Sequence, residues 1–240
     1  MRWVTTSWNQ VLAVRDAPTE ASRVALESLC QIYWYPVYVF VRRQRIEEED
    51  ARDATQAYFA QLLEKGYLED CDPARGRFRA FLMASVRHFL SKERDRTRAW
   101  KRGGRTDVVS LDADAEGRYR LEPADQATPE ALFERRWALT VLARALDRLH
   151  QEHVLDGREQ EFEQLKPFLT GEEPKTPYRH VAAGLRMSES AVKTSVHRLR
   201  LRFGSALRDA IAETVADPNE VDDEVRHLLG VLAPWRTGDP

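Results

Sequence analysis

Four side chains near the end of the chain have the chemistry and spacing of a nucleic-acid contact surface. They recur at helical spacing and share the outer side of a predicted helix: Lys193, Thr194, His197 and Arg198. Lysine and arginine bind phosphates or guanine acceptors, whereas threonine and histidine form hydrogen bonds at base edges. Over residues 186–208, Glu189 is the one acid among the lysines and arginines. Such a concentration of positive charge favours a polyanionic partner; the alternative is an ordinary solvated helix face.

The elements that must position these residues form a predicted helix-turn-helix over 176–210. Thr176 and Pro177 are typical of a helix start, because a hydroxyl satisfies free amides and proline fits the first turn. Met187 lies in the turn, and Ser188 caps the second helix. An apolar stripe on that helix is predicted to face inward, formed by Val192, Val196, Leu199 and Phe203.

Composition limits the classes of protein that fit. The chain has 240 residues and a formal net charge of −2, so nucleic-acid binding must come from local patches. Cys30 and Cys71 show neither CxxC spacing nor a disulfide framework, which fits a reducing compartment. The N-terminal residues lack the apolar core of a signal peptide, and no later run has the length of a membrane span. We therefore expect a cytoplasmic protein with no membrane partner.

Patterns of catalysis and metal binding are absent from the sequence. His150 and His153 share a predicted helix face, but no third ligand follows at a suitable spacing. The serine, histidine and acidic residues form no nucleophile motif. We expect a protein that is not an enzyme and that needs no metal and no cofactor.

Apolar residues recur at helical spacing almost everywhere, which predicts an all-α fold of two small helical domains. Pro36 is expected to break or kink a long helix that starts at Thr19, and Thr128 with Pro129 starts another. A further helix begins at Asp217 and is expected to fold back on the protein. The predicted parts are an N-terminal extension (1–18), a first domain (19–102), a flexible acidic linker (103–127), a second domain ending in the helix-turn-helix (128–210) and a C-terminal helical extension (211–240).

The first domain contains an acidic helix followed by a basic one. In the acidic helix over 47–66, an apolar side is predicted to face the core, formed by Tyr58, Phe59 and Leu62, which leaves Asp50, Asp53 and Gln56 on a more exposed side. Glu93 and Asp95 are the only acids among the many cations of 75–105, where aromatic residues are interleaved. One-signed charge of this kind favours a second nucleic-acid surface over a solubilising helix end.

This order of elements resembles bacterial RNA polymerase sigma factors of the extracytoplasmic-function (ECF) group. The resemblance covers roughly residues 24–210 and is most specific in DARDATQAYF and MSESAVKTSVHRLR, which look like the region two polymerase-binding helix and the region four recognition helix. It implies a promoter-specificity subunit that binds core RNA polymerase and promoter DNA, helps to melt the DNA and has no catalysis of its own. An anti-sigma factor is a further partner that the resemblance allows.

The resemblance also implies roles for individual residues. The polymerase-binding positions are Asp50, Asp53, Gln56 and Phe59. The minus-ten side is matched by Arg77, Arg79, Arg87, His88, Lys92, Arg94 and Arg96, and the minus-thirty-five side by Lys193, Thr194, His197 and Arg198. Many relatives have asparagine at the position of His88 and aspartate at that of Lys92. Arg186 stands where glycine is usual in the turn, at a cost of about 1–2 kcal/mol if its backbone is left-handed.

Two other classes of function compete with this interpretation. A helix-turn-helix regulator would bind its operator without polymerase, and a sigma-like adaptor would bind polymerase and leave DNA alone. The basic aromatic helix argues against both, since neither needs so much charge of one sign.

Overall fold

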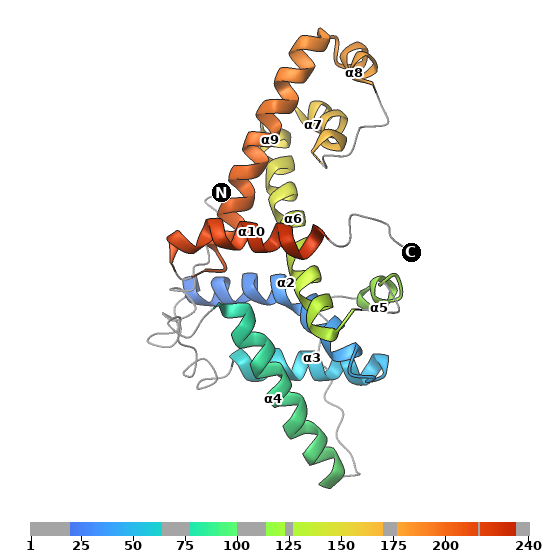
Figure 1. Ribbon diagram of the computed structural model, residues 1–240, viewed down its shortest axis with the longest axis vertical. Coiled ribbons are helices and arrows are strands. Elements are labelled where there is room, and N and C mark those ends of the chain that lie inside the picture. Colours follow the sequence, from blue (N-terminus) through green and yellow to red (C-terminus); the bar gives the residue numbers. More distant parts are fainter. Residues whose placement is uncertain are drawn as a thin grey trace. The chain divides into compact units, whose positions relative to one another are not determined.

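Helices make up every regular element of the residues that the computed structural model describes, which are 20–63, 77–99, 114–122, 127–169, 177–215 and 217–233 (Figure 1). The all-α prediction is confirmed for these residues. The helix expected at 7–15, the cap Thr176 and the cysteine Cys71 lie outside them.

Two compact units divide the chain. The first unit is Met1–Thr140 together with Ile211–Pro240, and the second unit is Val141–Ala210. The division falls inside α6 (Pro129–Leu155) and inside α9 (Glu189–Ala212). The domain boundaries expected from the sequence stay predictions.

The first unit is built around α2 (Glu20–Arg42), which packs against α3 (Glu48–Leu63). Tyr33 of α2 contacts Phe78, the first residue of α4 (Phe78–Ala99), edge-on with ring centroids 5.4 Å apart. The same tyrosine stacks on Phe133 of α6 at 6.4 Å. Aromatic contacts in these geometries add to the burial of their area, so α2 holds α4 and the start of α6 in one core.

Pro36 does not break α2, which continues to Arg42. A proline inside a helix removes one backbone hydrogen bond and costs about 3 kcal/mol. Here the residues after the proline are completely buried, so burial of their side chains offsets that cost: Val37, Tyr38, Val39, Phe40 and Val41. Tertiary packing overrides the local signal.

A short helix, α5 (Ala115–Tyr119), lies within the range expected to be a flexible linker. Its Glu116 is buried and pairs with Arg42 of α2. Glu122, three residues after α5, is also buried and accepts a hydrogen bond of 3.0 Å from the Tyr35 hydroxyl. The expectation of an extended linker is therefore wrong for residues 114–122, because this segment forms a helix and two of its acids bind inside the first unit.

The second unit contains the end of α6, α7 (Glu159–Leu165), the 3₁₀ turn η2 (Lys166–Phe168), α8 (Tyr178–Leu185) and most of α9. One apolar cluster joins them: Leu149, Phe162, Leu165, Phe168, Val181, Ala182, Val192, Val196 and Leu199. The end of α6 and η2 contribute one residue each, α7 and α8 two each, and α9 three at helical spacing, as expected for amphipathic helices around a shared core.

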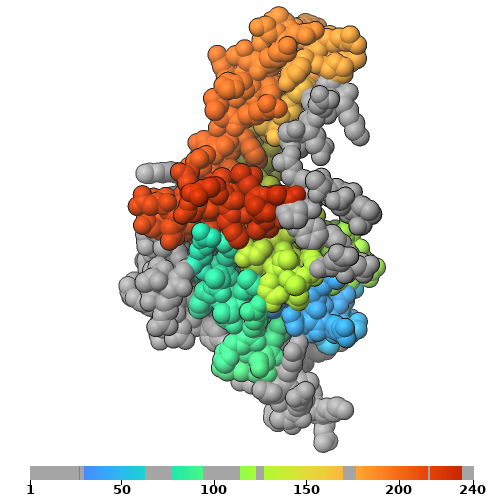
Figure 2. Space-filling view, viewed as in Figure 1, coloured from blue at the N-terminus to red at the C-terminus, as the bar shows by residue number. Residues whose placement is uncertain are grey.

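The C-terminal part returns to the first unit. Asp217 caps the 3₁₀ turn η3 (Pro218–Glu220) by accepting a hydrogen bond of 2.9 Å from the Asn219 amide. The next helix, α10 (Val221–Leu232), buries Glu224 and Leu228. It lies across the start of α4 and α6 (Figure 2), so the expectation that this helix folds back is confirmed.

Candidate nucleic-acid interface

The turn between α8 and α9 has well-defined local hydrogen bonds. Arg186 adopts a left-handed backbone with φ 54° and ψ 41°, as its place in the turn predicted. The Met187 amide donates to the Ala182 carbonyl at 2.9 Å, which closes the end of α8. The Ser188 hydroxyl then accepts a hydrogen bond of 3.1 Å from the Ala191 amide, so Ser188 caps α9 as predicted.

The inner side of α9 packs in the core of the second unit. Val192 is fully buried, and Val196 and Leu199 are 2% exposed. Val181 and Ala182 of α8 belong to the same cluster. Because the inner stripe fixes the rotation of α9 about its axis, the opposite side of the helix has a defined orientation relative to α8 (Figure 1).

The outer side of α9 carries all four residues predicted to contact the minus-thirty-five element, and each is exposed: Lys193, Thr194, His197 and Arg198. The Lys193 ammonium lies 5.6 Å from the ring centroid of Tyr178, at the start of α8. The Thr194 hydroxyl donates to the Ser190 carbonyl at 3.0 Å and keeps its lone pairs for an incoming donor. The structure therefore brings these side chains together on one accessible face.

Two arginines of α9 are already bound within the chain and so are not free to contact a ligand. Arg200 donates twice to the Phe168 carbonyl, at 3.1 and 2.9 Å, and so satisfies the end of η2. Arg202 pairs with Glu152 at 2.9 Å. Sequence reasoning counted both as part of a cationic patch, whereas Arg200 has a structural role that only the position of η2 reveals.

A small cavity of about 150 Å³ lies beside α9 and is partly lined by Arg158, Arg198 and Arg202. Arg158 is paired with Asp156 at 2.5 Å, and Arg202 with Glu152. The Asp156 carboxylate has a lowered pKa, chiefly because it accepts this hydrogen bond from Arg158. The charges around the cavity are thus largely balanced, and Arg198 alone connects it to the exposed face.

The predicted minus-ten residues have different surroundings in the first unit. His88 and Lys92 are exposed on α4. Arg87 is exposed and paired with Glu130; burial would raise the pKa of that carboxyl, but hydrogen bonds from its own backbone and from Arg87 keep it lowered. The side chains of Arg94 and Arg96 lie outside the described residues.

Arg79 does not face solvent, in contrast to its predicted role. Its side chain is 6% exposed and its Nε lies 2.9 Å from the Glu134 carboxylate, while its guanidinium also pairs with Glu224. The guanidinium carbon is 4.7 Å from the ring centroid of Trp137. Burial lowers the pKa of Arg79 even though the Glu134 carboxylate opposes the shift. An arginine held in this way cannot contact DNA while Glu224 remains in place.

The predicted polymerase-binding residues likewise include both exposed and buried side chains. Asp50 and Asp53 are exposed on α3, and Tyr58 and Leu62 face the core as expected. Gln56 is 8% exposed and Phe59 is 3% exposed, so the expectation that Gln56 lies on the exposed side is wrong. Gln56 lies on α3 between the exposed Ala60 and the buried stripe of Thr55 and Phe59. It therefore belongs to the edge of the buried side.

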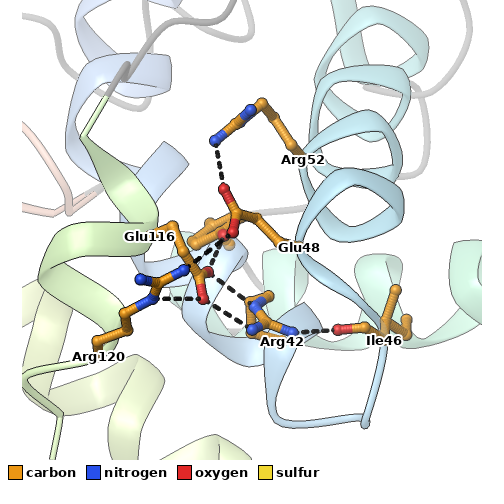
Figure 3. Close-up of polar contacts among 7 residues, drawn as sticks. Arg42, Ile46, Glu48, Arg52, Glu116 and Arg120 are labelled. Carbon is orange, nitrogen blue, oxygen red and sulfur yellow. Dashed lines mark hydrogen bonds and ion pairs between the residues drawn. The ribbon is translucent and has the colours of Figure 1, made fainter.

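A polar cluster around the buried Glu116 links α2, α3 and α5 and was not predicted from the sequence (Figure 3). Glu116 accepts hydrogen bonds of 2.9 Å from both Nε and Nη2 of Arg42 and one of 2.6 Å from the Tyr38 hydroxyl. Arg120 lies 3.6 Å from Glu116 and 3.5 Å from Glu48. The cluster fixes α5 on α2, and its charges satisfy one another instead of meeting a ligand.

Comparison with protein-family models, curated proteins and solved structures gives no match for this chain. In the part of the chain that the structure describes, no helix combines the length and the apolar character that crossing a bilayer requires. Within the same residues, no group of histidine, cysteine, aspartate and glutamate side chains could hold a metal ion.

Proposed function

We propose that this chain is a promoter-specificity subunit of the sigma type, which binds core RNA polymerase, recognises promoter elements and helps to melt DNA. The observation that supports the proposal most strongly is the α8–turn–α9 arrangement. It buries Val192, Val196 and Leu199 while leaving Lys193, His197 and their neighbours exposed on the opposite side. A helix-turn-helix needs this division, because its second helix must enter the major groove with base-reading side chains outward.

In the proposed mechanism, α9 binds the minus-thirty-five duplex. Arg198 and Lys193 contact phosphates or guanine acceptors, and Thr194 and His197 form hydrogen bonds at base edges. The exposed carboxylates Asp50 and Asp53 of α3 dock on a basic surface of the polymerase. Gln56 and Phe59 support these two carboxylates indirectly, because they pack on the buried side of α3 and hold the helix in place.

The exposed residues of α4 bind the minus-ten strand. His88 and Lys92 provide hydrogen bonding and positive charge, and Arg94 and Arg96 continue the basic run in the sequence. Single-stranded DNA binds to surfaces that combine cations with aromatic or imidazole rings. Strand capture offsets the cost of unstacking a base, which is a few kcal/mol.

The test is run-off transcription with purified core polymerase and a promoter library. We expect specific initiation that depends on the full chain and that is lost on Asp53→Arg or Lys193→Glu. Lys166→Glu is the matched control, because it makes the same charge change at an exposed residue of the second unit outside α9. Initiation from no sequence would contradict the proposal, as would equal effects of Lys193→Glu and Lys166→Glu.

A second function, a helix-turn-helix regulator that acts without polymerase, is favoured by one specific observation. Arg79 is buried on carboxylates of its own chain, and Arg77 and Arg87 are paired with Glu224 and Glu130, so part of the basic helix is self-neutralised. Such a regulator would bind selected duplex DNA tightly in the absence of polymerase. Tight binding by the chain alone, unchanged by Asp53→Arg, would favour this second function.

A further inference from the structure

The C-terminal helix places a buried carboxylate against two arginines at the start of α4. Glu224 is 2% exposed, its Oε2 lies 2.9 Å from Nη1 of Arg77, and its Oε1 pairs with Nη1 of Arg79. Figure 2 shows α10 (red) lying against this end of α4 (teal) and against α6 (lime). The carboxylate occupies the position where an outside anion would meet the same two guanidinium groups.

The charges at this contact balance only while α10 is present. Arg79 is also paired with Glu134 of α6, and His227 of α10 lies 3.1 Å from the same carboxylate. If α10 moved away, Arg79 would keep its ion pair with Glu134, whereas Arg77 would lose its ion pair with Glu224. The exposed surface would then carry excess positive charge, which favours binding of a polyanion.

The apolar attachment of α10 is small. Leu228 is fully buried, whereas Leu229 is 54% exposed and Gly230 contributes no side chain. The first turn of α10 faces solvent through Asp222 and Asp223. The helix is held by the fully buried Leu228, by half-buried apolar residues such as Val225, and by the ion pairs of Glu224 and His227. An element with so few fully buried apolar side chains opens at a lower free energy than the core helices of the unit.

We propose that the surface beneath α10 is a phosphate-binding surface, that α10 occupies it in the free chain, and that single-stranded DNA displaces the helix. The inference rests on the proposed function, because it extends the minus-ten surface of α4 to its first turn. Arg77 precedes α4 and Arg79 lies on its buried side, so a strand bound to the exposed Lys92 and His88 meets these two guanidinium groups only when Glu224 leaves. The C-terminal helix thus acts as an internal competitor of DNA.

Competition makes the two events thermodynamically linked. If bound DNA weakens the docking of α10 by some factor, docking of α10 weakens the binding of DNA by the same factor. A variant in which α10 docks less tightly must therefore bind DNA more tightly. The relation can be measured without knowing the promoter sequence, because contacts to the phosphate backbone do not depend on base identity.

The first experiment measures binding of the full-length chain to a fluorescein-labelled oligothymidylate at low salt. We expect Glu224→Gln to tighten binding by about tenfold, which is a typical coupling between linked sites. Asp223→Asn is the matched control, because it removes one negative charge from an exposed neighbour on the same helix. It should change the affinity by less than about twofold, because a solvent-exposed charge is screened.

The second experiment uses the unmodified chain, so it does not depend on how Glu224→Gln folds. Hydrogen exchange of residues 217–233 is followed with and without saturating oligothymidylate, and we expect faster exchange of α10 when the DNA is bound. Unchanged or slower exchange in the complex would overturn the inference, while promoter-dependent transcription would leave the proposed function standing. Faster exchange in Glu224→Gln without tighter binding would also overturn it and would point to an acidic protein segment as the occupant.

Discussion

Glu116 is the residue that holds α5 on α2. It accepts hydrogen bonds from Arg42 and Tyr38, and its side chain is 9% exposed. Burial by itself would raise the pKa of Glu116, but the hydrogen bonds from these two residues outweigh burial and keep the pKa below its usual value of 4.5. A carboxyl with a lowered pKa stabilises the fold above its pKa in the unfolded chain, and this contribution is lost as the pH falls through the folded value.

We expect Glu116→Gln to lower the free energy of unfolding by about 2 kcal/mol at pH 7, which is typical for charge-assisted hydrogen bonds. The difference from the unsubstituted chain should shrink as the pH falls from 4.5 through the lower pKa of the folded carboxyl, because the native side chain then also becomes neutral. Urea unfolding measured at several pH values tests both statements.

Glu49→Gln provides the comparison for this prediction, because Glu49 is an exposed carboxylate on the first turn of α3. Its loss should cost no more than about 0.5 kcal/mol, as is usual for a surface charge near a helix start. Equal losses for the two variants, or a Glu116→Gln effect that persists in acid, would mean that the ionised carboxyl does not hold α5.

Among the elements, the turn between α8 and α9 is the one whose backbone conformation carries a measurable cost. Arg186 has a positive φ of 54°, which an L-residue with a side chain adopts at an energetic penalty. Arg186→Gly should raise the free energy of unfolding by about 0.5–1 kcal/mol, after allowing for the greater freedom of glycine in the unfolded chain. Chemical denaturation of the full chain measures the change.

The informative control for the turn is Arg186→Ala, which removes the same charge and keeps the side-chain penalty at positive φ. It should give no gain in stability. A gain equal to that of Arg186→Gly would show that the charge of Arg186, and not its backbone, sets the cost.

Short-range signals in the sequence predicted the element boundaries well. The Thr128 hydroxyl accepts a hydrogen bond from the Ala131 amide at 3.1 Å, and Ser188 caps α9 in the same way. Each of these caps depends on residues within one helical turn, so the local sequence is enough to predict it. The positive φ of Arg186 is likewise a local feature, set by the turn in which the residue lies.

Contacts between distant parts of the chain could not be predicted. Glu116 and Arg42 are 74 residues apart, and acidic residues in a segment without periodicity are normally solvated. Arg79 likewise has the sequence context of a DNA contact, yet Glu224 neutralises it from the opposite end of the chain. Apolar periodicity indicates which side of a helix is buried but not which helix covers it. That α2 continues past Pro36 could not be predicted for the same reason, because the packing around α2 decides whether the proline is tolerated.

For the whole molecule, the important question is which cations are paired with carboxylates of the same chain and which remain exposed. In the first unit, Arg42, Arg79 and Arg87 are paired with carboxylates of the same chain. On the outer side of α9, Lys193 contacts an aromatic ring and Arg198 lies beside a cavity. Although the net charge is −2, this distribution leaves exposed positive charge on the outer side of α9, which the proposed function assigns to duplex DNA.

The salt dependence of duplex binding tests this division. For the full chain and a duplex promoter fragment that contains only the upstream element, Lys193→Ala should lower the slope of log K against log salt by about one, because one phosphate contact is lost. Arg87→Ala should leave that slope unchanged, since Arg87 belongs to the first unit and is paired with Glu130. Fluorescence anisotropy at several salt concentrations gives both slopes. Equal reductions for the two variants would mean that duplex DNA contacts cations in both units, and the assignment of the upstream element to α9 alone would then be wrong.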